Sequence, residues 1–255
     1  MLSLKTLMLG ATVAMAAAMP AASATAAEGQ KTVVLVHGAF ADGSSWAKVI
    51  PLLEAKGLKV VAVQNPLSSL AGDIDATKRI IDMQTGPVIL VAHSWGGMVI
   101  TGAGLNDKVA ALVYVAAFAP PKDMSVNGLV KGRPPLAWLS SVEPDSAGYL
   151  RLSGPAVAKY FAQDLPPDEI SVVAATQGPS FAGLFDEKLS AVAHESKPSW
   201  YIIAEQDGII PPDLEASMAK AIGAKTTSLA SSHVAMLSHP EQVVEVIMAA
   251  ADSVK

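Results

Sequence analysis

The sequence predicts an α/β fold in which a mostly parallel sheet of about six strands is covered by helices on both faces, with a helical cap inserted at about residues 118–198. Short, wholly apolar runs alternate along the chain with longer amphipathic runs, which is typical of repeated strand–helix units and a parallel sheet. The chain is 51% hydrophobic and only 16% charged, which fits strands that are buried on both faces.

The first four predicted strands precede residue 118. T-V-V-L-V at 32–36 is the first apolar run, and each later run is separated from the one before it by a helical segment. In the first of these segments the apolar residues share one helical face, and Gly57 is well suited to end it. The predicted strands are 32–36, 59–64, 87–92 and 109–116, and the predicted helices are 46–56, 74–83 and 96–104.

The pattern changes between residues 118 and 198. Three proline pairs interrupt this stretch, and only short segments, at 154–161 and 168–176, have a helical period. Because the strand–helix alternation resumes afterwards, we interpret the stretch as a cap within one domain spanning residues 28–255. The resumed elements are strands at 199–204 and 226–229 and helices at 212–222 and 240–251.

The first 27 residues have the character of a cleavable signal peptide. Lys5 is followed by an apolar stretch from about 7 to 19 and then by small residues of the A-x-A type. The apolar stretch is shorter than the ~20 residues that a membrane span requires. We therefore expect export to the periplasm or the medium, without a membrane anchor.

Composition excludes several other classes of protein. No cysteine is present, so neither disulfides nor thiolate chemistry can contribute. The formal charge is −5, and the absence of a Lys/Arg cluster argues against nucleic acid or an anionic membrane as a partner. No H-E-x-x-H, P-loop or glycine-rich dinucleotide turn occurs, so we expect neither a metal ion nor a cofactor.

Ser94 is the candidate nucleophile. It lies in Ala92-His93-Ser94-Trp95-Gly96, between a buried strand and a helix, where a sharp turn would hold its hydroxyl away from the backbone. The usual pattern is G-x-S-x-G, so Ala92 is the one departure and the place where we expect strain.

A serine nucleophile needs a base and a group that orients the base. Reactive groups of an open α/β sheet gather at the carboxyl ends of the strands, which favours His37 and His233 among the five histidines and leaves His239 possible. Asp207 follows the strand at 199–204, and Glu205 is an alternative carboxylate.

Two backbone N–H donors should stabilise the oxyanion. One is expected from Trp95, directly after the serine, and the other from Ala39 or Phe40 in the loop after the first strand. Phe40, Trp95 and Trp138 are candidate substrate-binding residues. Phe161, Phe181 and Phe185 are further candidates for an apolar lining, although for all but Trp95 plain core packing explains the residue equally well.

These segments resemble the α/β-hydrolase superfamily, and within it the cofactor-free esterases grouped with plant methyl esterases and hydroxynitrile lyases. The matching segments are 36–40 with Trp46, 93–97, 204–207 and 232–240. The resemblance implies an α/β-hydrolase fold, with Ser94 as nucleophile, His233 as general base and then acid, and Asp207 as the orienting carboxylate. Val234 occupies the position where hydroxynitrile lyases of this group carry a lysine, which disfavours cyanohydrin cleavage.

The sequence thus predicts a serine hydrolase that cleaves small carboxylic esters through an acyl-enzyme. A triad of this kind also serves cleavage of other bonds and cofactor-free perhydrolysis or haloperoxidation, and a ligand-binding module with a vestigial triad is a further alternative.

Overall fold

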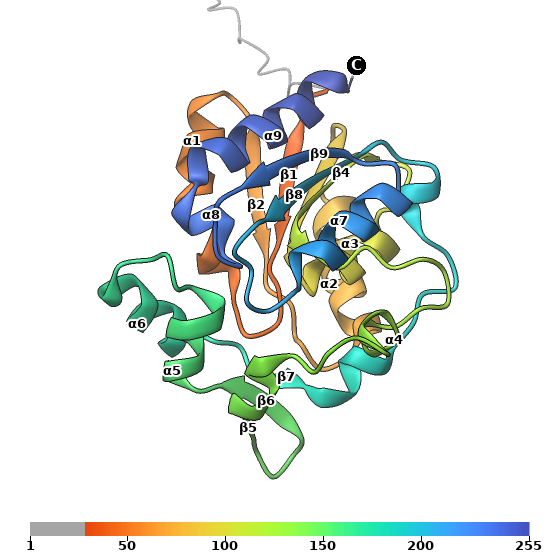
Figure 1. Ribbon diagram of the computed structural model, residues 1–255. Helices are drawn as coiled ribbons and strands as arrows, with labels where there is room; N and C mark the ends of the chain where they lie inside the picture. Colours follow the sequence, from red (N-terminus) through yellow and green to blue (C-terminus); the bar gives the residue numbers. More distant parts are fainter. Residues whose placement is uncertain (1–28, 255) are drawn as a thin grey trace, which may run out of the picture.

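Six parallel strands form the central sheet of the computed structural model, which describes residues 29–254 (Figure 1). The predicted signal peptide, residues 1–27, lies outside the described residues. The strand order is β2-β1-β3-β4-β8-β9, so the predicted mostly parallel sheet of about six strands is confirmed. The strands are β1 (Thr32–Val36), β2 (Lys59–Val63), β3 (Val88–Ser94), β4 (Val109–Ala117), β8 (Ser199–Ala204) and β9 (Lys225–Leu229).

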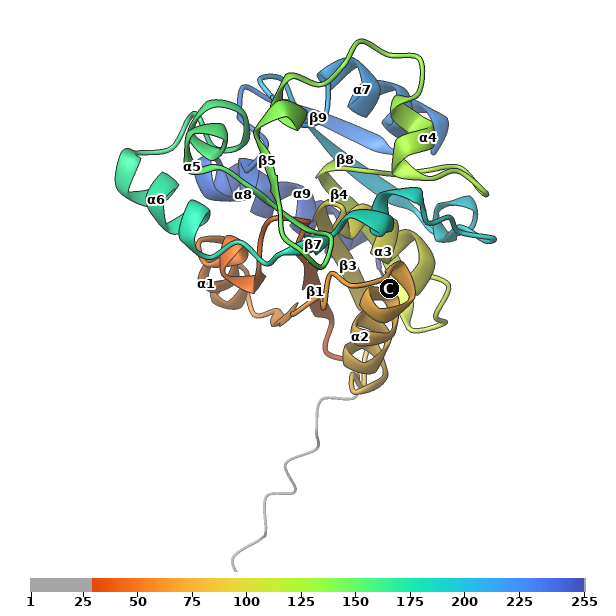
Figure 2. The same ribbon diagram turned by 90° about the horizontal axis from the view of Figure 1, so that it is seen from below.

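Helices cover both faces of this sheet. Figures 1 and 2 show α1 (Val49–Ala55) and α9 (Pro240–Ser253) on one face of the sheet. On the other face lie α2 (Leu70–Asp82), α3 (Gly96–Ala103) and α7 (Pro212–Ala221). Every residue of β1 and β3 is buried, as expected for central parallel strands.

Two helices begin at other residues than the sequence predicts. Trp46 belongs to a short 3₁₀ helix, η1 (Gly43–Trp46), whose start is capped by the Asp42 side chain, and α1 begins only at Val49. The helix α2 begins four residues before the predicted position, because the Ser69 side chain accepts a hydrogen bond from Gly72 N–H and caps it.

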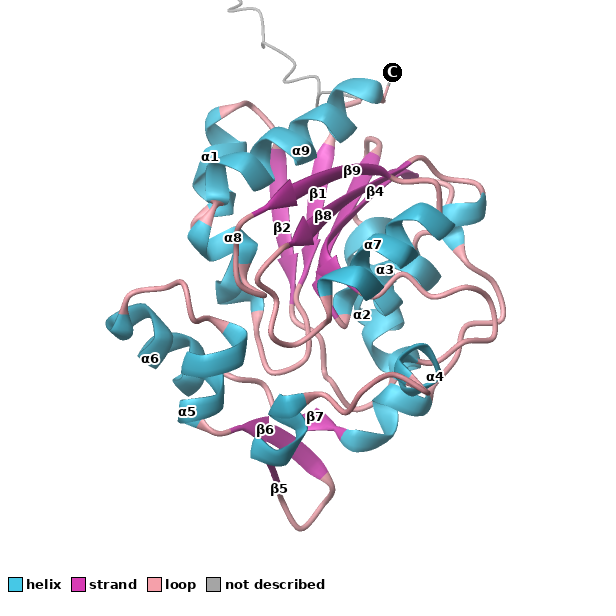
Figure 3. Cartoon of the chain, viewed as in Figure 1, coloured by secondary structure: helices cyan, strands magenta, loops and turns pink. Residues whose placement is uncertain are grey.

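The cap contains strands that the sequence analysis did not predict. Besides short helices, it has an antiparallel sheet of three strands, which lies with α4 (Val126–Val130), α5 (Gly154–Ala156) and α6 (Pro167–Ala175) below the central sheet in Figure 3. These strands are two to four residues long, too short to show a period. The other cap elements are η2 (Ala137–Ser141), β5 (Val142–Pro144), β6 (Tyr149–Leu152), η3 (Val157–Phe161), β7 (Ser180–Phe181), η4 (Ala182–Asp186) and η5 (Ala193–Glu195).

Within residues 29–254, no helix combines the length and the apolar character that crossing a membrane requires.

Candidate active site

Ser94 is the last residue of β3, and its backbone is strained. Its φ of +53° lies in the left-handed region, which a residue with a side chain rarely adopts. A strained backbone of this kind costs on the order of 1–3 kcal/mol and is typical of functional sites. Ala92, where we expected strain, instead pairs regularly with Val36 and Tyr114 within the sheet, so the strain lies at the serine itself.

The two glycines after Trp95 are required by close approaches of the backbone. A Cβ on Gly96 would lie 2.6 Å from the carbonyl oxygen of Val36, and one on Gly97 would lie 2.1 Å from that of Phe118. Real Cβ atoms do not approach backbone this closely. Both positions therefore exclude any side chain, and the turn after Ser94 can pack against the ends of β1 and β4.

A buried histidine and aspartate lie next to this turn. His233 Nδ1 and Asp207 Oδ2 are 2.5 Å apart, and both side chains are inaccessible to solvent. The ring of His233 lies 4.5 Å, between centroids, from the ring of His93, the residue before Ser94. His233 Nε2 is buried without a hydrogen-bond partner among the described residues, and no hydrogen bond joins it to Ser94. The structure thus brings His233 and Asp207 together beside Ser94.

Asp207 is held by the backbone that follows it. Its Oδ1 accepts hydrogen bonds from Ile209 N–H, at 2.6 Å, and Ile210 N–H, at 2.9 Å. The other oxygen, Oδ2, is left for His233. One carboxylate oxygen therefore faces the loop and the other faces the imidazole.

A second buried carboxyl group, Glu215 of α7, lies near Asp207. Its Oε2 accepts a hydrogen bond from Ala204 N–H, while its Oε1 is buried without a partner among the described residues. Burial, and secondly the charge of Asp207, raises the pKa of Glu215 well above its ordinary value. The sequence analysis did not identify Glu215, because a glutamate in the first turn of a helix is usually explained by the helix dipole.

Replacing Glu215 with glutamine should raise the free energy of unfolding at pH 8, and the gain should disappear as the pH falls to about 4.5. Because the pKa of Glu215 is higher in the folded chain, the folded chain holds this proton more strongly than the unfolded chain, which loses it above the ordinary pKa of 4.5. Folding must then take up a proton, which becomes costlier as the pH rises. Denaturant unfolding of both proteins at several pH values measures the difference.

The control is Glu54→Gln on the exposed side of α1, which should change stability by less than about 0.5 kcal/mol at every pH. A gain from Glu215→Gln that does not vary with pH would contradict a protonated Glu215.

His37, His93 and His194 are each bound to backbone groups; for His194 the partner is Pro120 O, 2.9 Å from its Nε2. Asn65 N–H donates to His37 Nε2, so the His37 proton is on Nδ1 and is donated to Gly38 O. His93 Nε2–H donates to His233 O at 2.9 Å. Burial lowers the pKa of both His37 and His93, which favours their neutral forms. His239 is the N-cap residue before α9, and its Nδ1 lies 2.9 Å from Ser238 Oγ. These contacts leave His233 as the histidine paired with a carboxylate.

The exposed Glu205 is not part of this pair. Its backbone N–H bonds to Leu229 O, and its side chain forms no hydrogen bond among the described residues. Asp207, and not Glu205, is therefore the carboxylate that the structure places at the imidazole.

Ala39 N–H and Phe40 N–H, the two candidate oxyanion donors in the loop after β1, differ in their hydrogen bonding. Phe40 N–H donates to the side chain of Ser180 in the cap at 3.1 Å, and Phe40 has a φ of +56°. Neither Ala39 N–H nor Trp95 N–H forms a hydrogen bond within residues 29–254. Ser180 lies 140 residues from Phe40 in the chain, so no local pattern could have identified it.

Trp95 is fixed by a buried aspartate. Its indole N–H donates to Asp73 Oδ2 at 2.8 Å, and Leu67 N–H donates to the other oxygen. Burial raises the pKa of Asp73, although both hydrogen bonds act in the opposite direction. Asp73 thereby holds the side chain next to Ser94, a role that its sequence position in the first turn of α2 does not reveal.

An apolar cavity of about 240 Å³ opens at Ser94. Ser94 and Asn127 are the only polar residues among those that line it, and no charged side chain does so. The aromatic residues of its wall are Phe40, Trp95, Phe118, Trp138 and Phe185.

The candidate substrate-binding residues all reach this cavity. Trp138 donates its indole N–H to Ile209 O, in the loop after Asp207, and its ring stands edge-on to Phe40. Phe161 instead packs against His233, with ring centroids 5.0 Å apart, outside this cavity. Phe181 is 37% exposed and packs on Tyr149 within the cap, so its proposed place in the lining is wrong.

Among residues 29–254, no group of three or more His, Cys, Asp and Glu side chains is arranged to hold a metal ion.

Comparison with known proteins gives matches over nearly the whole described chain. A protein-family model described as the alpha/beta hydrolase family matches residues 33–246. Methylesterase 7 of Arabidopsis thaliana is 30% identical over 254 residues, covering 88% of this chain and 97% of that protein. A pyrethroid hydrolase of Sphingobium wenxiniae is 28% identical, with 87% of this chain and 88% of that protein covered.

Solved structures show the same fold. The crystal structure of polyneuridine aldehyde esterase matches with a TM-score of 0.74 and 22% identity, covering 88% of this chain and all of that chain. That of a pyrethroid hydrolase matches with a TM-score of 0.75 and 23% identity, covering 88% and 98%.

Proposed function

The chain belongs to the alpha/beta hydrolase family as a carboxylesterase-type enzyme, and on that premise we propose that it cleaves neutral esters of small molecules through an acyl-enzyme on Ser94. The predicted resemblance to plant methyl esterases is confirmed by the relatives found. One observation carries the proposal: a serine with a φ of +53° lies beside a buried histidine whose Nδ1 is 2.5 Å from a buried carboxylate.

In the first step, His233 Nε2 removes the proton of Ser94 as its Oγ attacks the ester carbonyl carbon. Asp207 accepts the Nδ1–H of His233, which keeps Nε2 free of a proton and able to act as the base. The absence of a hydrogen bond between Ser94 and His233 is compatible with this role, since such bonds often form only when substrate is bound.

The negative charge that develops on the carbonyl oxygen needs preorganised donors. Ala39 N–H and Trp95 N–H are suited to this task because neither is used elsewhere in the described chain. Phe40 N–H is committed to Ser180, so of the two candidates in that loop we assign Ala39. Ser180 then acts indirectly, by holding the loop in place.

His233 next gives its proton to the departing alcohol, leaving the acid esterified to Ser94. A water molecule, activated by the same nitrogen, attacks the acyl-enzyme and releases the acid. The proton returns to Ser94, so the cycle consumes one water and needs no further reactant.

The lining of the cavity at Ser94 indicates the kind of ester. Because it has no charged side chain, a free carboxylate or ammonium group on the substrate would be desolvated there without compensation. Uncharged aliphatic or aromatic acyl groups are therefore favoured. The relatives named as methylesterases and as a pyrethroid hydrolase support a small-molecule ester as the substrate.

We also propose that the enzyme acts outside the cytoplasm. The proposal depends on the leader of residues 1–27, with its single lysine, short apolar stretch and small residues. N-terminal sequencing of the exported protein should give a start near residue 25 or 28.

The test is steady-state and burst kinetics on p-nitrophenyl acetate, followed by a panel of neutral and charged esters. We expect turnover with an initial burst of p-nitrophenol whenever deacylation is the slower step, and a preference for neutral over carboxylate-bearing esters. A protein that binds these esters without hydrolysing them would be a ligand-binding module, and the proposal would fail.

A further inference from the structure

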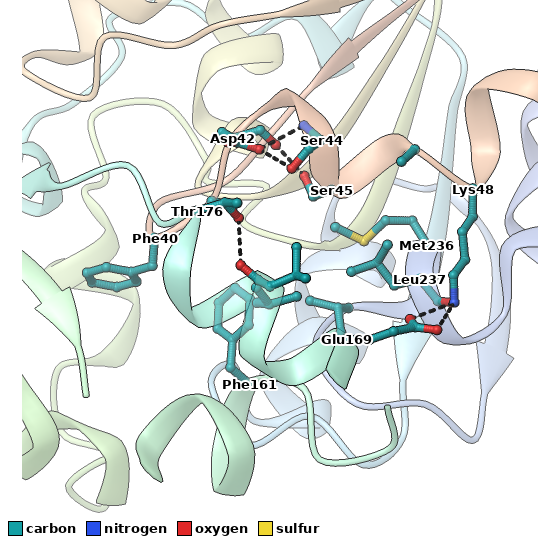
Figure 4. A pocket seen from close by; sticks show the side chains of 15 residues that line it. Phe40, Asp42, Ser44, Ser45, Lys48, Phe161, Glu169, Thr176, Met236 and Leu237 are labelled. Atoms are coloured by element: carbon teal, nitrogen blue, oxygen red, sulfur yellow. Dashed lines mark hydrogen bonds and ion pairs between the residues drawn. The ribbon is translucent and has the colours of Figure 1, made fainter. Parts of the chain in front are cut away.

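A second cavity lies on the other side of Phe40, with a volume of about 370 Å³. Phe40 lines both cavities, so its side chain is part of the wall between them. Figure 4 shows the second cavity extending from Phe40 at one end to an ion pair of Lys48 and Glu169 at the other. Nothing in the catalytic steps above uses this space.

The second cavity adjoins the base and not the nucleophile. Val234, the residue after His233, is part of its wall, and so is Phe161, whose ring stands edge-on to the imidazole of His233. Ser94 and Ala39 instead line the first cavity. The two cavities therefore lie on the His233 side and on the oxyanion side of the reaction centre.

This arrangement is matched to the two halves of an ester. For His233 to protonate the departing alcohol, the ester oxygen must come within hydrogen-bond reach of Nε2. The carbon chain of the alcohol then extends past His233, while the acyl group stays with the serine and the oxyanion donors. Of the two cavities, the second is the one on the His233 side, so a large alcohol group would extend into it.

Helix α6 of the cap covers the second cavity and is only partly buried, with Ile170, Val173 and Ala174 packed against the core. None of its residues is fully buried, and Val172 is 58% exposed even though it lines the cavity. Lys48 fastens the helix at its first turn by bonding to both carboxylate oxygens of Glu169, and it also donates to Leu237 O. Apolar surface of α6 thus remains available for contact with a ligand, which would gain by burying it.

The geometry points to the second cavity as the binding site for a bulky apolar alcohol group, such as a benzyl or cyclohexyl group, with the acyl group in the cavity at Ser94. This inference rests on the proposed function. It adds a substrate class: esters of an apolar acid with an apolar alcohol considerably larger than methanol.

The experiment fills the second cavity and compares two esters of one acid, methyl phenylacetate and benzyl phenylacetate. Val173→Trp adds volume from α6, and Ala47→Phe adds it from an exposed position on the opposite wall, where folding does not depend on repacking. Ala175→Trp is the matched control, because Ala175 is exposed on the same helix and does not line the cavity.

Val173→Trp and Ala47→Phe should each lower kcat/KM for the benzyl ester by about tenfold or more, as is usual for steric exclusion from an apolar pocket. The methyl ester should be cleaved at the wild-type rate by both variants, and Ala175→Trp should leave both esters unaffected. Thermal unfolding verifies that each variant is folded. If Val173→Trp does not fold, the result for Ala47→Phe tests the inference.

Two results would overturn the inference: equal loss for both esters, or no loss for either. Failure of the proposed function is a different result, in which the wild-type protein hydrolyses neither ester.

Discussion

Replacing Ser94 with alanine should lower kcat for p-nitrophenyl acetate by about four to six orders of magnitude, as removal of the nucleophile does in other serine hydrolases. The alanine has no atom to form the acyl-enzyme, while the cavity, the proposed donors Ala39 and Trp95, and the pair of His233 and Asp207 remain. Ester binding should therefore persist. Removing the hydroxyl from a strained position should leave the thermal midpoint close to that of the wild type. Steady-state kinetics and calorimetry measure the two effects.

Ser199→Ala is the matched control, since Ser199 is also a buried serine. It begins β8, so it lies at the amino ends of the parallel strands, whereas Ser94 lies at their carboxyl ends. Ser199→Ala should retain wild-type kcat. If the wild type and Ser94→Ala hydrolyse the ester at the same slow rate, Ser94 is not the nucleophile.

Asp207→Asn should lower kcat by about ten-thousand-fold. Because Oδ1 accepts from Ile209 N–H and Ile210 N–H, the oxygen of an asparagine would remain at those donors. Its NH₂ group would then face His233 Nδ1 and force the imidazole proton onto Nε2. The base would be blocked by its own proton, although the fold and the cavity would be unchanged.

Glu205→Gln controls for the loss of a nearby carboxylate, and it should have wild-type kcat because the side chain is exposed and away from His233. A fully active Asp207→Asn together with an impaired Glu205→Gln would transfer the orienting role to Glu205. Both rates can be measured with the assay used for Ser94→Ala.

The sheet and the positions of Ser94, Asp207 and His233 were predictable because the signals for them are local. The wholly apolar run 32–36, the small residues around Ser94, and the positions of Asp207 and His233 after late strands each follow from short segments. Parallel topology then brings the ends of β3, β8 and β9 to one edge, so chain order was enough to place the three side chains there.

The contacts that support the site were not predictable, because each joins distant parts of the chain. Ser180 reaches Phe40 across 140 residues, and Asp73 bonds the Trp95 indole from another helix. The choice between Ala39 and Phe40 depended on the first of these contacts. Glu215 required the packing of α7 against the end of β8, which no sequence period encodes.

The strands of the cap were also not predictable from the sequence. Strands of two to four residues are too short for a two-residue period, and the β5–β6 turn depends on the Asp145 side chain accepting from Ala147 and Tyr149 N–H. The cavity beneath α6 could not be inferred at all, since its walls combine residues of the cap with residues from two distant segments, 40–48 and 234–237.

The most direct test of the central claim is mass spectrometry of the enzyme after reaction with a serine-directed fluorophosphonate. The account predicts one adduct per chain on the peptide containing Ser94, slow labelling in Asp207→Asn, and none in Ser94→Ala. Labelling of another serine, or unchanged labelling of Ser94→Ala, would contradict it.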